Sequence, residues 1–266
     1  MVQANLPLPR YIYVNRSEQV SAHLQRIYFS TDNFADLSPL QNGAHIKLFF
    51  PEQADAKPQL PYRNEAGKMV WLGSKPITRT YTLHQVLQKE QLLVIDFVRH
   101  ADFGIASDWA IHAKPGHVLG LAGPGGPERF NHHAKYWVFI GDLSALPMIS
   151  ASLQQLPPHA QGQVWIEIED SADQMILNAP SEMQINWIIQ NEQAEAKIIH
   201  AMQQLDWQSE HISVSLAGEN TRVIALRQLF KTQFKCAKAN LYAVPYWKQG
   251  ESEECYHEQR HLVMDS

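Results

Sequence analysis

The sequence predicts a chain of two parts, an antiparallel β-sandwich or β-barrel followed by an α/β domain with a parallel sheet. Three observations predict this fold class. Short β-type segments separated by glycine and proline fill the first half, whereas apolar and helical segments alternate in the second half. The length of 266 residues allows one large domain or two modest ones. We place the boundary near Phe130, which gives domains of residues 1–130 and 131–266.

Composition excludes several classes of protein. Hydrophobic residues make up 45% and charged residues 18%, as in globular proteins. The formal net charge of −5 lacks the basic excess of nucleic-acid-binding proteins. Cys236 and Cys255 are too few for a disulfide scaffold and lack the CxxC spacing, so we expect free thiols. No secretory leader or long apolar run is visible, so we expect a cytoplasmic protein without membrane insertion. We also expect a monomer.

The first half contains six predicted strands, each rich in β-branched and aromatic residues. They are Tyr11–Asn15, His23–Ser30, His45–Phe50, Thr78–Gln85, Gln91–Arg99 and His117–Ala122. One short helix is predicted over Ser107–Ala113, because Ser107 is a good N-cap and Pro115 ends the helix. The segment Gln53–Gly73 is the longest predicted loop.

The second half alternates strands and helices, which predicts a parallel sheet covered on both faces. Such a sheet binds ligands at the carboxyl ends of its strands, near a switch point in the strand order. The predicted strands are Tyr136–Ile140, Gln163–Ile168, Gln184–Gln190, His211–Leu216 and Asn240–Val244. The predicted helices are Ser144–Leu156, Asn191–Leu205, Glu219–Phe234 and, in the tail, Ser252–Val263.

The run Arg79-Thr80-Tyr81-Thr82 is the first candidate for a binding site. Residues two apart on a strand share a face. We expect one face to offer a cation for phosphate, a ring for stacking and a hydroxyl for hydrogen bonding, a set that suits a flavin nucleotide. The same residues are also ordinary strand composition, so the run alone does not separate the two interpretations. Downstream, the loop at Gly104 leads into a helix whose free backbone N–H groups suit a pyrophosphate.

These runs, taken in order, resemble the siderophore-interacting proteins, which belong to the ferredoxin-reductase-like flavoproteins. The matching runs of the first half are RTYT, DFVRH, DWA, PGH and AGPGG, and those of the second half are GDLSALP, AGE and YWKQG. The resemblance covers nearly the whole chain. It implies an N-terminal Greek-key β-barrel that binds FAD and a C-terminal α/β domain that binds NADH or NADPH.

The resemblance also implies roles for individual residues. Arg79 faces the FAD phosphates, Tyr81 packs on the flavin, Thr82 lies near its N5 edge, and Trp247 covers the flavin until nicotinamide displaces it. The implied cofactor-binding set is Arg79, Thr80, Tyr81, Thr82, Asp96, Phe97, Val98, His100, Gly104, Ala106, Ser107, Trp109 and Trp247. The implied nicotinamide-binding set is Gly141, Asp142, Ser144, Ala145, Gly218 and Glu219. The family often has Pro-Arg after the RxYT run. Leu83-His84 stands there in this chain, which leaves a phosphate contact from that position open.

The resemblance implies Lys47 and Lys248 as contacts for an anionic ferric siderophore, and Arg129 is a third, weaker candidate whose loop matches no motif of the family. A carboxylate in the acidic run Glu167–Asp170 can accept from a ribose hydroxyl and repel a 2′-phosphate, which favours NADH over NADPH; alternatively, the run faces solvent. We expect no resident metal. His257 and His261 are four apart on a predicted helix but have no third ligand.

The sequence therefore predicts an enzyme that reduces ferric siderophores with NAD(P)H through FAD and releases Fe²⁺ in the cytoplasm. The flavin N5 carries the chemistry, so no catalytic side chain is expected. Two alternatives stay open. One is a general flavin electron transferase with a protein or quinone acceptor, and the other is a non-catalytic siderophore- or iron-binding protein.

Overall fold

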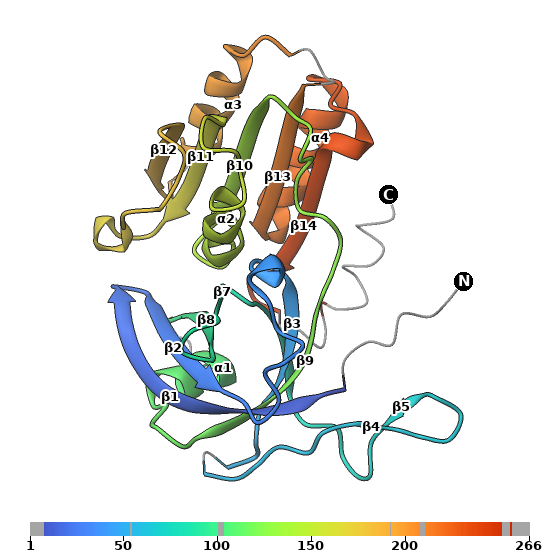
Figure 1. The fold of residues 1–266 in the computed structure, drawn as a ribbon. Helices are drawn as coiled ribbons and strands as arrows, with labels where there is room; N and C mark the ends of the chain where they lie inside the picture. The colour runs from blue at the N-terminus through green and yellow to red at the C-terminus, as the bar shows by residue number, and fades with distance from the viewer. Residues whose placement is uncertain are drawn as a thin grey trace. The chain divides into compact units, whose positions relative to one another are not determined.

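The computed structural model describes residues 8–53, 55–100, 104–191, 193–207, 211–251 and 256. The chain divides into two compact units, residues 1–126 and 127–266 (Figure 1). The division follows Gly126, whereas the sequence places the boundary at Phe130. Phe130 belongs to the second unit because its ring packs 6.0 Å from that of Phe139, on the first strand of that unit.

The first unit is built on a seven-stranded antiparallel sheet in the order β6-β3-β9-β1-β2-β8-β7. Its strands are β1 (Arg10–Ser21), β2 (Leu24–Ser30), β3 (His45–Phe49), β6 (Thr78–Thr82), β7 (Gln85–Leu87), β8 (Leu92–Val98) and β9 (Val118–Gly125). Although β6 and β7 lie at opposite edges, only Leu83 and His84 separate them. The Leu83 N–H donates to Ala44 O and the His84 N–H to Val94 O, each at 2.9 Å. The sheet is therefore barrel-like without closing completely, which confirms the predicted class.

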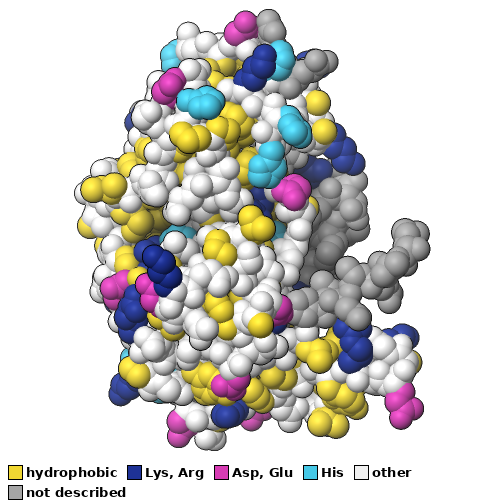
Figure 2. All heavy atoms as spheres, in the orientation of Figure 1, with side chains coloured by type: hydrophobic (Ala, Val, Ile, Leu, Met, Phe, Trp, Pro, Cys, Tyr) yellow, Lys and Arg dark blue, Asp and Glu magenta, His cyan; other side chains and the backbone are white. Residues whose placement is uncertain are grey.

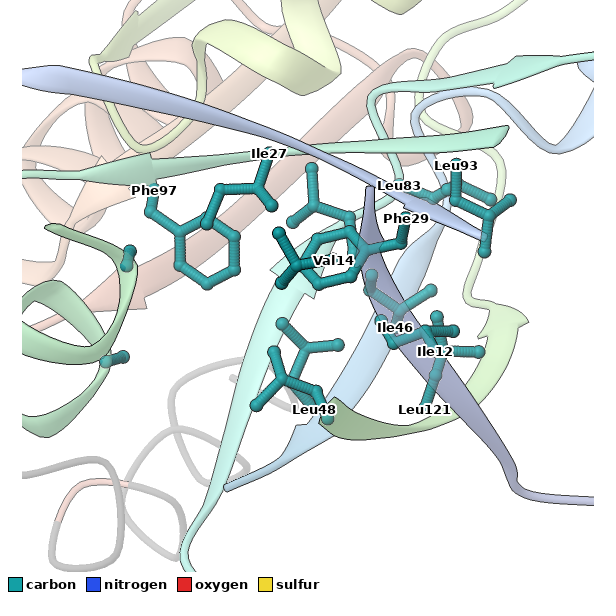
Figure 3. Packing of buried hydrophobic residues seen from close by; sticks show 14 of the residues in the cluster. Ile12, Val14, Ile27, Phe29, Ile46, Leu48, Leu83, Leu93, Phe97 and Leu121 are labelled. Carbon is teal, nitrogen blue, oxygen red and sulfur yellow. The ribbon is translucent and has the colours of Figure 1, made fainter. Parts of the chain in front are cut away.

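Alternation along the strands creates the core of the first unit (Figure 3). Apolar side chains on one face of β1, β2 and β3 point toward one another, as Ile12, Ile27 and Leu48 do, and each of these is fully buried. Helix α1 (Ile105–Ile111) adds Trp109 to the same cluster. The predicted cap is wrong, since Ser107 lies inside this helix, where its hydroxyl accepts from the His100 N–H at 3.1 Å.

The predicted loop Gln53–Gly73 contains a small hairpin, formed by β4 (Tyr62–Arg63) and β5 (Met69–Val70). Strands of two residues are too short to show a repeat of two, so the sequence pattern missed them. A single 3₁₀ turn, η1 (Pro39–Gln41), precedes β3.

The second unit holds a five-stranded parallel sheet in the order β12-β11-β10-β13-β14. Its strands are β10 (Tyr136–Asp142), β11 (Gln161–Ile168), β12 (Glu182–Ile189), β13 (Ile212–Glu219) and β14 (Leu241–Trp247). Its helices are α2 (Leu146–Leu153), α3 (Ala194–Gln203) and α4 (Asn220–Thr232), with 3₁₀ turns η2 (Ser171–Asp173) and η3 (Lys238–Asn240). All predicted strands and the three internal helices are confirmed. The order reverses between β10 and β13, and this is the switch point.

The tail helix predicted over Ser252–Val263 lies outside the described residues except for Tyr256, whose hydroxyl donates to Asn220 Oδ1 at 2.6 Å. Cys236 is a free, buried thiol whose pKa is raised by that burial to about 11, and Cys255 also lies outside the described residues. In the described part of the chain, no helix has the length and apolar character needed to cross a membrane.

Candidate functional site

A cavity of about 620 Å³ lies at the carboxyl ends of the parallel strands in the second unit. Four strands supply its wall: Asp142 ends β10, Glu167 comes from the end of β11, Glu219 ends β13 and Trp247 ends β14. The cavity therefore occupies the switch point, where α/β sheets bind their ligands. Further lining residues include Gly141, Gln190, Glu195, Ala217, Thr221, Arg222, Lys248 and Gln249.

Two glycines allow the ends of β10 and β13 to approach each other beside this cavity. A Cβ on Gly141 would lie 2.6 Å from Ala145 Cβ and 2.8 Å from Ala217 O. Gly218 has a φ of +134°, and a Cβ there would lie 2.5 Å from Asp142 Oδ2. The predicted nicotinamide-side residues Gly141, Asp142, Ala145 and Gly218 thus come together for a steric reason.

Asp142 connects three segments at the edge of the cavity. Its Oδ1 accepts from the Ser144 N–H at 2.9 Å and from the Ser144 hydroxyl at 2.5 Å. Its Oδ2 accepts from the Glu219 N–H at 2.9 Å and from the Trp247 indole N–H at 2.8 Å. One carboxylate therefore holds the β10–α2 turn, the end of β13 and the end of β14.

The residues of the acidic run Glu167–Asp170, on which the expectation of NADH rests, lie in two different environments. Glu167 is buried and forms a two-point ion pair with Arg222, with distances of 2.9 Å to Nε and 3.2 Å to Nη2. Burial raises the pKa of Glu167, and Arg222 partly opposes that rise. Arg222 also pairs with Glu195. Glu169 and Asp170 are exposed. Only Glu167 of the four-residue run lines the cavity, so the solvent-facing alternative holds for Glu169 and Asp170.

The start of α4 is already capped by the protein itself. The Glu219 carboxylate accepts from the Thr221 N–H at 2.6 Å and from the Arg222 N–H at 3.1 Å. By contrast, no side chain caps the start of α2, where Ala145 is the N-cap residue. A phosphate group would meet a competing carboxylate at α4, and at the start of α2 the Ser144 and Ala145 N–H groups already donate to Asp142 while Pro147 has no N–H.

In the first unit, the groups of the RTYT run lie on two faces of β6. Tyr81 is opposite Ile46 and packs against the core, with its ring 4.6 Å from that of Phe97. Arg79 shares that face because it is two residues away. Thr80 lies opposite Lys47 and Thr82 opposite His45, both on the other face. The expectation that one face presents cation, ring and hydroxyl together is therefore wrong for the hydroxyls, since a two-residue repeat separates Thr82 from Tyr81.

Asp96 on β8 is committed to contacts inside the first unit. Its carboxylate accepts from Arg26 Nε at 2.7 Å and Nη2 at 2.8 Å, and it pairs with His84 Nδ1 at 2.7 Å. Burial alone would raise the pKa of Asp96, but the pairs with Arg26 and His84 hold it below its usual range. His84 of the unusual Leu83-His84 pair therefore turns toward Asp96, and Arg26 supplies the cation.

The remaining predicted cofactor residues surround the start of α1. His100 is exposed and lies against Gly104, where a Cβ would come within 2.6 Å of the ring. The N-cap residue of α1 is Gly104, which has no side chain that could cap the helix. Trp109 and Phe97 are core residues, with rings 6.2 Å apart. Ala106 and Ser107 are buried, and Val98 is half-buried. The structure thus gathers Arg79, Tyr81, Phe97 and Trp109 on the core side of the unit.

This donor set fits the FAD implied by the sequence. Arg79 is half-buried and can bind a phosphate. The ring of Tyr81 is partly exposed and can stack on a planar ring. The start of α1 has no side-chain cap and can bind a second phosphate.

The three predicted substrate residues have different surroundings. Lys47 is exposed on β3 in the first unit. In the second unit, Lys248 is half-buried and paired with Glu251, and Arg129 Nη2 donates to Gln155 Oε1 at 3.3 Å. Among the described residues, no group of His, Cys, Asp and Glu side chains is arranged to hold a metal ion.

The sequence missed the charged partners Arg26, Glu195 and Arg222. Arg222 had one usable signal, since it lies in the first turn of the helix that follows β13 and therefore near the switch point. Arg26 had none, because 70 residues separate it from Asp96.

Comparison with known proteins assigns both units. The model of the siderophore-interacting FAD-binding domain matches residues 13–128, and the model of the siderophore-interacting protein matches residues 134–250. The ferric vibriobactin reductase ViuB of Vibrio cholerae is 40% identical over 260 residues, which cover 97% of this chain and 96% of that protein. The NADPH-dependent ferric-chelate reductase of Escherichia coli is 31% identical over 243 residues, covering 90% and 92%.

The crystal structure of the siderophore-interacting protein SipS from Aeromonas hydrophila superposes with a TM-score of 0.82 and 32% identity, covering 97% of this chain and 99% of that one. Family models thus match most of the chain in the two units that the structure separates, and the predicted family is confirmed. The chain belongs to the siderophore-interacting protein family of FAD-containing oxidoreductases.

Proposed function

We propose that this protein reduces ferric siderophores with electrons that it takes from NADH or NADPH through FAD. The observation that carries the proposal is the cavity at the switch point of the second unit, in a chain whose first unit is an FAD-binding domain. ViuB is named as a ferric vibriobactin reductase and the Escherichia coli relative as a ferric-chelate reductase, which supports an iron chelate as the substrate.

FAD, when bound, supplies hydride acceptance from nicotinamide and one-electron delivery to an acceptor. The protein binds and orients it. In the proposal, Arg79 and the uncapped start of α1 hold the phosphates, and the partly exposed Tyr81 ring packs on the flavin. Thr82, on the other face of β6, lies near the N5 edge of the flavin in this proposal. His100 and Gly104 shape the turn before α1, with Val98, Ala106 and Ser107 beside them. Asp96, Phe97 and Trp109 support this site from within the unit.

The nicotinamide nucleotide binds in the switch-point cavity of the second unit. Gly141 and Gly218 leave room for it, and Ser144 and Ala145 in the turn after β10, which Asp142 holds in place, are its further contacts in the proposal. Glu167 and Glu195 surround Arg222 and neutralise it, so the Arg222 charge is already balanced before a 2′-phosphate could approach it. We therefore propose NADH as the preferred reductant.

The substrate is held by attraction of opposite charges. Siderophores present hard oxygen ligands, which bind Fe³⁺ far more tightly than Fe²⁺, so reduction releases the metal. Lys47, Lys248 and Arg129 supply positive charge for the anionic chelate. Lysine suits a bulky anion that needs attraction more than a two-point fit. The face drawn in Figure 2 carries basic and acidic side chains scattered among uncharged ones. We propose that the protein works as a monomer in the cytoplasm and releases Fe²⁺ there.

Anaerobic mixing of the purified protein with NADH, and separately with NADPH, tests the proposal. The oxidised flavin absorption should bleach with at least one nucleotide. A protein that binds FAD but is bleached by neither nucleotide would be a siderophore-binding flavoprotein without turnover, and the proposal would be wrong.

The substrate residues need a separate test. Lys47→Ala and Lys248→Ala should each raise the KM for a ferric siderophore, with the exposed Lys89→Ala as the control, and Lys47→Ala should leave flavin reduction unchanged. Lys248 also lines the nucleotide cavity, so the KM for the siderophore is measured for Lys248→Ala at saturating nucleotide. An unchanged KM in the Lys47→Ala/Lys248→Ala double variant removes both lysines from the site.

A further inference from the structure

The connection between β3 and β6 projects from the first unit as a hairpin, formed by β4 and β5 (Figure 1). We call residues 56–77 the hairpin segment. Among the described residues, twelve large hydrophobic side chains are exposed, and four of them lie in this segment. They are Tyr62, Met69, Leu72 and Ile77, and Leu72 is 84% exposed. Exposed apolar side chains that gather in one place mark an interaction surface, whereas scattered ones do not.

Apolar contacts fix the base of the hairpin segment on the sheet. The ring of Trp71 meets that of Phe49 on β3 edge to face, with the ring centroids 5.3 Å apart. Leu60 covers Gly120 on β9, where a Cβ would lie 2.4 Å from Leu60 Cδ2. Phe49 and Gly120 are partners in the β3–β9 ladder. The hairpin is therefore anchored at its base, so its exposed apolar side chains have a fixed support.

The apolar face of the hairpin is turned away from the sheet. Partners in an antiparallel ladder share a face, so Tyr62 lies on the same side as Val70. Trp71 packs toward the sheet, on Phe49, and neighbouring residues of a strand point to opposite faces. Tyr62 and Val70 therefore face away from the sheet, and the exposed Leu72 follows two residues after Val70. A hairpin that packs only on its own sheet would reverse this, with polar side chains outward.

The hairpin segment is also basic, in a chain whose formal net charge is −5. It contains four basic residues and one acidic residue, Glu65. The basic residues are Lys57, Arg63, Lys68 and Lys75, and all four are exposed. Figure 2 shows basic side chains beside hydrophobic ones over the part of the molecule that the hairpin occupies in Figure 1. The surface thus combines apolar side chains with positive charge, which suits an anionic partner with an apolar interior.

We propose that the hairpin segment docks on the surface of an anionic lipid bilayer. Tyr62 and Leu72 enter the headgroup region, and Lys68 and Lys75 lie against lipid phosphates. Tyrosine suits this depth because its ring is apolar and its hydroxyl stays in contact with water. The hairpin rests on the bilayer without crossing it. The proposal does not depend on the identity of the electron donor or acceptor, so its failure would leave the proposed function untouched.

A lipid surface fits the hairpin better than a protein partner does. The two strands have two residues each, and the hairpin projects as a narrow tip. A tip of this size offers little area compared with the about 800 Å² that each side of a stable protein interface buries. A fluid bilayer, in contrast, can close around the tip and supply phosphates wherever a basic side chain reaches. Docking would hold the first unit at the membrane, because the segment joins β3 to β6.

Co-sedimentation of the FAD-loaded protein with lipid vesicles tests the proposal. Vesicles of phosphatidylglycerol and phosphatidylcholine in equal parts should bind the protein, and pure phosphatidylcholine should bind it at least about tenfold more weakly. Leu72→Ser should lower the affinity for the anionic vesicles about tenfold, because it removes a leucine from the apolar boundary. Leu40→Ser is the matched control, since Leu40 lies on η1 and is 88% exposed, and it should leave the affinity unchanged. Absence of binding to the anionic vesicles, or equal effects of the two variants, overturns the proposal.

Charge variants test the basic part of the surface with the same anionic vesicles. Lys68→Gln and Lys75→Gln should each lower the affinity about fivefold. Lys89→Gln, at an exposed lysine between β7 and β8, is the control and should leave the affinity unchanged. Raising the salt concentration from about 0.05 M to about 0.5 M should also weaken binding, because salt screens exposed charges. Binding that neither the two variants nor salt weakens would contradict docking on lipid phosphates.

A fluorescent label distinguishes a lipid surface from a protein partner. An environment-sensitive dye attached at Leu72→Cys should brighten when anionic vesicles are added, whereas the same dye at Leu40→Cys should not. Cys236 and Cys255 are present in both variants, so their labelling cancels in the comparison. If the hairpin instead pairs two copies of the chain, the dye at Leu72→Cys brightens with protein concentration and not with vesicles. That result would overturn the membrane proposal.

Discussion

The two units bring their site residues together in different ways. In the second unit, Asp142, Glu167, Glu219 and Trp247 come from four parallel strands and meet in one cavity, because the carboxyl ends of parallel strands share one edge. In the first unit, the antiparallel strands alternate their side chains between two faces. A run of adjacent site residues is therefore divided there, with Tyr81 on the core side and Thr82 on the other.

The same difference appears in the use of buried carboxylates. Asp96 lies inside the first unit, where Arg26 and His84 occupy both of its oxygens. Asp142 also accepts several hydrogen bonds, but it lies on the wall of a cavity and one of its donors is half exposed. Asp96 of the antiparallel unit thus serves contacts inside the fold, whereas Asp142 at the parallel edge lies on the wall of a cavity.

The largest effect that tests this comparison is the loss of the Asp96 charge. Asp96→Asn leaves the Arg26 guanidinium without its buried partner, which should lower the free energy of unfolding by about 3–5 kcal/mol. Urea unfolding at neutral pH measures this loss of stability. Asp108→Asn, at an exposed aspartate, is the control. A loss below about 1 kcal/mol would mean that Asp96 is not structural.

The stability of the wild-type protein should depend on pH through the same residue, Asp96. Because its pairs hold the pKa of Asp96 below the ordinary value of 3.8, the stabilisation is complete above that value and is lost as the pH falls through the folded-state pKa. Asp96→Asn should remove this part of the acid sensitivity.

A second, smaller effect is expected at the parallel edge. Gly218→Ala places a Cβ against the Asp142 carboxylate at a φ of +134°, so unfolding of the second unit should become easier by about 2 kcal/mol, with the FAD content unchanged. Gly67→Ala also has a positive φ, of +76°, but meets no atom within 4 Å, and it should have about half that effect. Equal losses in the two variants would show that Gly218 does not fix the strand ends.

The smallest predicted effect concerns the choice of reductant. Glu167→Gln removes one of the two carboxylates that neutralise Arg222, so the ratio of kcat/KM for NADPH to that for NADH should rise about three- to tenfold. Glu169→Gln, exposed in the same run, should leave the ratio unchanged. Because burial raises the pKa of Glu167, mildly acidic pH should move the wild type in the same direction. A ratio that Glu167→Gln does not alter would remove Glu167 from coenzyme selection.

Much of the fold can be predicted from the sequence because its patterns are local. Alternating apolar strands and helices specify the second unit, and glycine and proline separate the strands of the first. The β4–β5 hairpin could not be predicted, because strands of two residues are too short to show an alternation of apolar and polar residues. Helix α1 begins at Ile105 and not at Ser107, since the backbone at Gly104 starts it without a side-chain cap.

The candidate site is less predictable where its contacts are long-range. The turns at Gly141 and Gly218 show in the sequence as glycines after apolar strands, but their close approach depends on the sheet order. The ion pairs of Arg26 with Asp96 and of Arg222 with Glu167 join residues that are 70 and 55 positions apart. No spacing rule relates such residues before the topology is known.

The most direct measurement of the central claim is anaerobic double mixing. The FAD-loaded protein is first reduced with one equivalent of NADH and then mixed with a ferric catecholate siderophore and a chelator that is coloured only with Fe²⁺. The account predicts that flavin absorption returns as the Fe²⁺ complex forms, with two Fe²⁺ for each flavin reoxidised. Reduced flavin that persists in the presence of the ferric siderophore, with no Fe²⁺ detected, would contradict it.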